Sequence, residues 1–206
     1  MSHTPDIKES IVAAIAYERQ SNQFHKQLTI LLPQLKEKLV LPDEDPVSAL
    51  IEFTVSYIES VPGSINLVTT VSKRLGFYRY AAPFLHIAED FFIQDLAAEI
   101  GLEALLDEAF LAHRLLEELN DHYIRHLGQP LLPVDMTEAN IIVHHLLGDT
   151  LASRLEALVQ FAAKRLLDKE AVWDKVRALP GSSDVIGFTS SQSDANRQIR
   201  IRTGVL

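Results

Sequence analysis

Apolar residues recur every three or four positions through most of this sequence, which is the spacing of one face of an α-helix. Clusters of glycine and proline separate the segments that carry this pattern. Two-residue alternation, which is typical of strands, occurs only in the segment RQIRIR at residues 197–202. The pattern therefore predicts an all-α fold, a bundle of long helices with a short helical pair inserted at residues 46–76. We predict helices at residues 5–40, 46–60, 64–76, 83–99, 102–127, 136–168 and 169–178. Pro33 lies within the first of them and should kink or break it.

Composition limits the class of protein. The 206 residues are 47% apolar, which suits one domain with a sizeable core, and we place that domain at residues 1–180. The net charge of −9, with no basic run, argues against binding to nucleic acid or to an anionic membrane. No apolar run approaches the roughly 20 residues of a membrane helix, and the first residues show no secretory signal pattern. We expect a cytoplasmic protein.

Cysteine is absent, which removes disulfides, thiolate catalysis and cysteine-based metal sites. The sequence also lacks a glycine-rich phosphate loop, a G-x-S-x-G elbow and an H-E-x-x-H helix. These absences leave histidine and the carboxylates as the candidates for chemistry.

Residues 181–206 differ from the rest of the chain because they are rich in Ser, Gly and Asp. We predict an extended or mobile C-terminal arm. The arm is either a frayed end or a segment that docks on a neighbouring subunit, and we expect a homo-oligomer.

Polar residues interrupt the apolar stripes of four predicted long helices, with apolar turns on both sides of each interruption. Burying an unpaired carboxylate is costly, so each inward group requires a partner. In the stripe that His144 interrupts, Gly148 leaves room beside the imidazole. The interrupting residues are Glu18, Ser21 and His25 in the first helix, then Glu89, His113 and His144 in the later helices.

Inward carboxylates and imidazoles are the ligands that a metal ion inside a helix bundle requires. We therefore predict an iron or manganese site that would activate dioxygen or polarise a small organic substrate, as in an oxidoreductase or oxygenase. The predicted ligands are Glu18, His25, Glu89, His113 and His144. Alternates or supporting partners are His86, Glu117, His145 and Asp149.

The alternative is a non-enzymatic helical protein that dimerises or receives a small apolar ligand. The Glu-x-x-His motif of metal-binding bundles is absent. Pairs of a histidine and an acid three or four residues apart, such as His86 with Glu89 and His113 with Glu117, are common by chance. In this interpretation the inward polar residues only specify packing. From stripe position we predict that His113 and His144 are mostly buried, whereas His122 and His126 lie exposed near a helix end.

In architecture, residues 5–168 resemble ferritin-like and haem-oxygenase-like helical proteins, because they combine long helices with inward Glu and His. The resemblance implies a helical bundle and, for the ferritin-like proteins, di-iron chemistry. No site residue is carried over from it, since this sequence lacks the Glu-x-x-His motif.

Overall fold

A computed structural model describes residues 7–93, 101–132, 135–167, 169–179 and 199–202. Nearly all of the regular structure in these residues is α-helical, which confirms the predicted all-α bundle. The helices are α1 (Ile7–Ser21), α2 (Gln23–Lys38), α3 (Pro46–Arg74), α4 (Tyr78–Ile93), α5 (Leu102–Leu127), α6 (Thr137–Leu147), α7 (Asp149–Leu166) and α8 (Glu170–Arg177). Two short strands, β1 (Leu39–Val40) and β2 (Arg200–Ile201), complete the fold.

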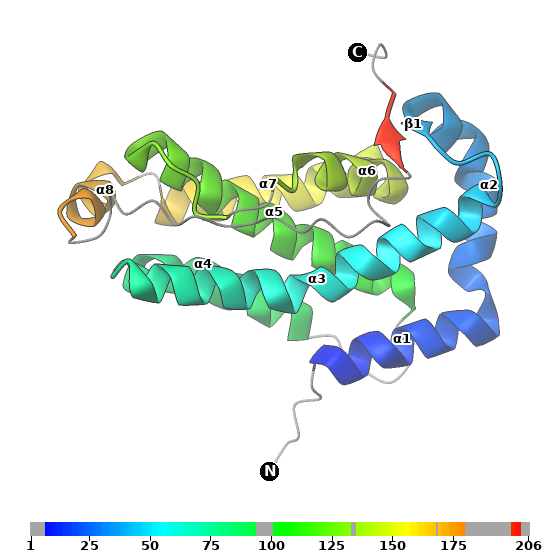
Figure 1. Cartoon of the computed structure of the whole chain (residues 1–206), viewed down its shortest axis with the longest axis horizontal. Coiled ribbons are helices and arrows are strands. Elements are labelled where there is room, and N and C mark those ends of the chain that lie inside the picture. Colours follow the sequence, from blue (N-terminus) through cyan, green and yellow to red (C-terminus); the bar gives the residue numbers. More distant parts are fainter. Residues whose placement is uncertain (1–6, 94–100, 133–134, 168, 180–198, 203–206) are drawn as a thin grey trace.

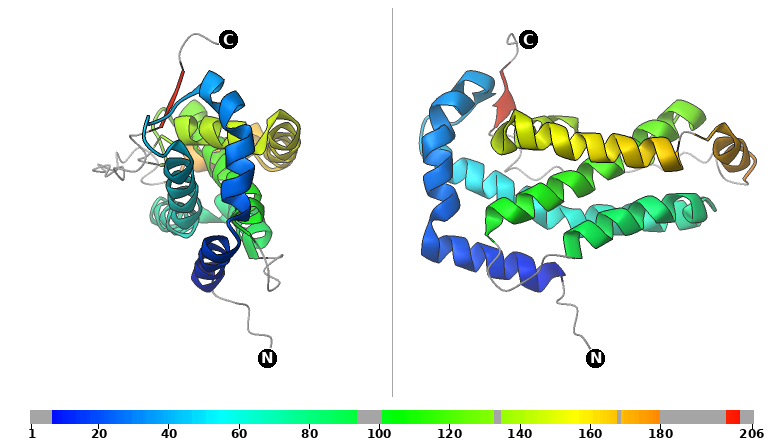
Figure 2. Two further views of the ribbon diagram at one scale, coloured as in Figure 1. Left: turned by 90° about the vertical axis from the view of Figure 1, so that its right-hand side faces the viewer. Right: turned by 180° about the vertical axis from the view of Figure 1, so that it is seen from behind.

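Helix α5 is the centre of the bundle, with the bounds predicted from the sequence, and it packs against α3, α4, α6 and α7. Buried side chains cover most of its circumference, and the remaining strip includes the exposed Glu103 and Asp121. Helix α2 stands crosswise at one end of the bundle, and α8 lies at the other end (Figure 1). The views in Figure 2 show α2 beside the beginning of α7, with α5 passing between α7 and the α3–α4 layer. This arrangement gathers α2, α5, α6 and α7 around one corner.

The predicted first helix is divided at Asn22, whereas the sequence favoured a break at Pro33. Asn22 adopts a left-handed conformation with φ of 49°, which asparagine tolerates better than most residues. Pro33 remains inside α2, on its exposed side. Pro33 has no N–H to donate to the backbone carbonyl four residues earlier. On this exposed side water can hydrogen-bond to that carbonyl, so the missing helical hydrogen bond costs little. As a result, α2 turns away from α1 after residue 22.

The predicted helical pair at residues 46–76 is a single helix, α3, which continues through Pro62. Val61 and Ile65 lie one turn apart on its buried face, so packing holds the helix together across the proline. Helix α4 likewise begins at Tyr78 and includes Pro83, although the sequence predicted a start at residue 83. Burial against α5 outweighs the loss of one backbone hydrogen bond at each proline.

The predicted helix at residues 136–168 is two helices, because Gly148 ends α6 with φ of 80°. Its N–H donates to the carbonyl of His144 at 3.0 Å, as expected at a glycine that terminates a helix. The predicted role of Gly148, to make room for an imidazole inside a continuous helix, is wrong. Its role is instead to let α7 take a new direction.

Strand β2 pairs antiparallel with β1, with Leu39 opposite Ile201. This pairing confirms the short strand predicted at RQIRIR, and Ile199 beside it is fully buried. The rest of the predicted C-terminal arm lies outside the described residues. No helix within the described ranges combines the length and apolar character needed to cross a membrane.

Candidate functional site

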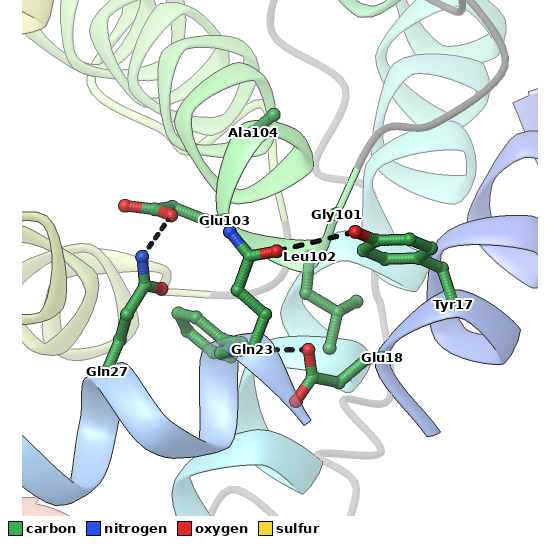
Figure 3. A pocket seen from close by; sticks show the side chains of 9 residues that line it. Tyr17, Glu18, Gln23, Gln27, Gly101, Leu102, Glu103 and Ala104 are labelled. Carbon is green, nitrogen blue, oxygen red and sulfur yellow. Dashed lines mark hydrogen bonds between the residues drawn. The ribbon is translucent and has the colours of Figure 1, made fainter. Parts of the chain in front are cut away.

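Glu18 is buried, as predicted, at the corner where α1 gives way to α2 (Figure 3). Its two carboxylate oxygens accept backbone N–H groups from the first turn of α2, at 2.9 Å from Phe24 and 3.0 Å from His25. Asn22, the residue that precedes α2, forms no side-chain cap. The carboxylate therefore caps α2 at its N-terminus, where the helix dipole favours negative charge. Its partners are backbone groups of α2 rather than the predicted side chains Glu89, His113 or His144.

We expect Glu18→Gln to lower the free energy of unfolding by about 1–2 kcal/mol. The amide would replace one accepting oxygen with a donor that cannot bind an N–H group, and the charge at the helix end would be lost. Urea unfolding measures the change, with Glu59→Gln, at an exposed position in the middle of α3, as the control. The metal hypothesis makes a separate prediction, that Glu18→Gln lowers the iron or manganese content of purified protein. Stability equal to that of the control would contradict the capping role.

His113 is buried as predicted and contacts the backbone of α3. Its Nε2 lies 2.9 Å from Ser60 Oγ and 3.1 Å from the Tyr57 carbonyl oxygen, and its ring lies 4.5 Å from the Tyr57 ring. Burial lowers the pKa of this imidazole to about 4, so the ring is neutral near pH 7. These contacts lie close to Pro62, where α3 loses a backbone donor. His113 thus joins α5 to α3 at that position.

Glu117, which the sequence offered only as an alternate ligand, lies at the centre of a buried polar network. Its carboxylate accepts hydrogen bonds from Arg114, from Thr137 Oγ1 at 2.8 Å and from Asn140 Nδ2 at 2.6 Å. Asn140 in turn accepts a hydrogen bond from Tyr57 at 2.6 Å. The network links α5 to α6 and α3, and its oxygens are engaged by protein donors.

The helical face chosen for α6 was wrong. Ile141 is 39% exposed, whereas Asn140 and Val143 are buried, so His144 lies at the edge of the core. His144 Nδ1 lies 3.2 Å from Glu156, and its Nε2 lies 3.4 Å from Asp149 at the start of α7. The spacing of Asn140, Val143 and Leu146 is the sequence signal that would have found the correct face.

His122 is buried, contrary to prediction, and His126 is half-buried. The reason is the packing of α8, whose Trp173 ring stacks on His126 at 4.6 Å and on His122 at 6.1 Å. His122 also pairs with Glu118 one turn earlier, at 3.4 Å. The end of α5 is therefore a packed contact with α8 and not a solvated helix end.

The remaining predicted ligands make local contacts. Glu89 pairs with the exposed His86 on α4 at 3.5 Å, and the His25 carbonyl accepts a hydrogen bond from Thr29 at 2.8 Å. Within the described residues, no group of three or more His, Asp or Glu side chains is placed to hold a metal ion. Of the five predicted ligands, the structure brings Glu18 and His25 into contact with each other, through the His25 backbone N–H. Glu89 and His144 instead contact the alternates His86 and Asp149, and metal binding stays a prediction from the sequence.

A groove at the corner of α2, α5, α6 and α7 is the feature that the sequence did not reveal. It has a volume of about 280 Å³, near the lower limit of ligand pockets in proteins. Ile30 at its rim is 77% exposed, and Leu151 is 36% exposed. The apolar part of its lining includes Phe24, Ile30, Leu31, Leu106, Leu147 and Leu151.

One wall of the groove is acidic. Asp107 and Glu103 lie one turn apart on α5 and both line the groove. Asp107 Oδ1 is shielded from solvent and has no hydrogen-bond partner among the described residues. Burial, with a smaller effect from the charge of Glu103, raises the pKa of Asp107 to about 6.

A smaller cavity of about 170 Å³ adjoins this groove and lies beside Glu18 (Figure 3). The two share Phe24, Gln27 and Glu103 in their linings. The Gln27 side-chain amide donates to Glu103 at 2.6 Å and so connects α2 to α5 between them. This contact fixes the position of α2 over the acidic wall.

Comparison of the chain with protein-family models, curated protein sequences and solved structures finds no match. Evidence for a function therefore comes from the geometry of these sites.

Proposed function

We propose that this protein is a non-enzymatic helical binding protein, which receives a small apolar ligand in the groove between α2, α5 and the α6–α7 corner. The observation that carries the proposal is the groove itself, whose apolar lining ends in the solvent-exposed Ile30 and Leu151. Apolar side chains that surround a concave surface and remain exposed are typical of binding sites.

The inward polar residues support the same interpretation. Glu18 caps α2, His113 bonds to the α3 backbone, and Glu117 accepts donors from three side chains. Each group therefore has a role in holding helices together. These structural roles explain why the groups are buried, without requiring that they catalyse a reaction.

Binding of the neutral fluorescent probe N-phenyl-1-naphthylamine tests the groove. We expect Ile30→Glu to weaken the probe's affinity at least tenfold, because the substitution removes apolar contact and places a charge at the rim. Fluorescence titration measures the affinity. Stability should change little, because the Ile30 side chain is already in solvent.

The matched control is Val12→Glu, which makes the same kind of change at a 65% exposed position on α1, outside the groove. It should leave the probe's affinity unchanged. Equal effects of the two substitutions would contradict a site in the groove. A change of oligomeric state in Ile30→Glu, without any change in probe binding, would favour dimerisation instead.

The iron- or manganese-dependent oxidoreductase inferred from the sequence stays a separate hypothesis. Elemental analysis of the purified protein tests it, and about one ion per chain would favour it over the binding protein proposed here.

A further inference from the structure

The groove combines an apolar floor with two carboxylates in its lining. Neither Asp107 nor Glu103 forms an ion pair with a Lys or Arg side chain in the described part of the chain. Among the described residues, Gln27 donates the one hydrogen bond to this pair, to Glu103, and Asp107 has no hydrogen-bond partner. A carboxylate that is partly removed from water and lacks a partner is unfavourable, and a bound cation would compensate it.

We propose that the ligand of the groove is a small organic cation, a protonated amine on an apolar body, whose ammonium group binds Asp107 and Glu103. The inference rests on the proposed binding function and adds the chemical class of the ligand. The apolar part would contact Ile30, Leu106 and Leu151, and the ammonium group would donate hydrogen bonds to the α5 wall. An anionic ligand would be repelled by the same wall.

The charge around the groove comes from α5 alone. The lining side chains contributed by α2, α6 and α7 are uncharged, so Glu103 is the titratable neighbour that faces Asp107 within the groove. At a pH one unit below the pKa of Asp107, about nine in ten of these carboxyls are protonated in the free protein. A primary amine stays protonated at that pH, since its own pKa is near 10. Any loss of amine binding in acid therefore reports on the carboxylates.

Calorimetric titration of the whole protein with octylamine, octanol and octanoate tests the proposal, because the three compounds share one apolar chain. At pH 8 we expect octylamine to bind at least tenfold more tightly than octanol, and octanoate to bind most weakly. At pH 5 the preference for octylamine over octanol should fall by about tenfold.

Asp107→Asn should reduce the preference for octylamine to threefold or less while leaving octanol binding unchanged. The matched control is Asp121→Asn, which makes the same change at an exposed position of α5 outside the groove and should keep the full preference. Equal binding of octylamine and octanol to the unaltered protein would overturn the cation proposal and leave the apolar binding function standing. Absence of binding by all three compounds, and by the naphthylamine probe, would overturn both.

Discussion

Glu117→Ala is expected to lower the free energy of unfolding by about 3–5 kcal/mol. The substitution would remove the acceptor that the buried Asn140 amide shares with the Arg114 guanidinium group, which keeps a 3.9 Å contact with Glu156. The cost comes from these unpaired donors more than from the lost contacts themselves. Urea denaturation followed by circular dichroism measures the change.

The exposed carboxylate Glu59 on α3 provides the control, because Glu59→Ala should change stability by no more than about 0.5 kcal/mol. The double substitution of Arg114 and Glu117 to alanine should cost less than the sum of the two single changes, since it removes the charge and its partner together. A loss below about 1 kcal/mol for Glu117→Ala would show that the network does not stabilise the fold.

Acidification is expected to remove about 3 kcal/mol of stability through His113 alone. Burial holds the pKa of this imidazole at about 4, whereas the unfolded chain has the ordinary value near 6.5. Between these values the unfolded state binds a proton that the folded state does not. Stability from this residue is therefore complete above pH 6.5 and declines as the pH falls toward 4. Unfolding free energies measured in urea at pH 7, 6, 5 and 4 give the slope.

His113→Gln separates this effect from the other titrations of the protein. Glutamine can still donate to the Tyr57 carbonyl but cannot titrate. The loss of stability between pH 6.5 and 4 should therefore shrink by most of the about 3 kcal/mol that His113 contributes. His86→Gln makes the same chemical change at an exposed position of α4 and should retain the full loss. An unaltered slope in His113→Gln would place the acid sensitivity elsewhere.

Helical periodicity predicted the fold class and the limits of α5, because that helix carries buried residues along its whole length. The breaks were harder to place, since they depend on single residues. Asn22 and Gly148 end helices by adopting positive φ, whereas Pro33, Pro62 and Pro83 lie inside helices that neighbouring elements hold in place. A proline shows that a hydrogen bond is missing, but packing decides whether the helix continues.

The burial of Glu18 could be predicted from its stripe, but its partner could not. That partner depends on the left-handed turn at Asn22, which places the first N–H groups of α2 over the carboxylate. The sequence did not indicate Asp107 as a site residue, for a related reason. Its surroundings depend on α2 standing crosswise at the end of α5, and the direction of one helix relative to another is a tertiary property.

The pairing of β1 with β2 joins residues about 160 positions apart in the sequence. Closing so long a loop carries a large entropic cost unless the intervening helices are already packed, so this contact belongs to the late stages of folding. Interactions that form after the folding barrier govern the rate of unfolding and have little effect on the rate of folding. We therefore expect the two short strands to contribute chiefly to kinetic persistence, because β1 follows α2 directly and β2, which is paired with it, contacts α6.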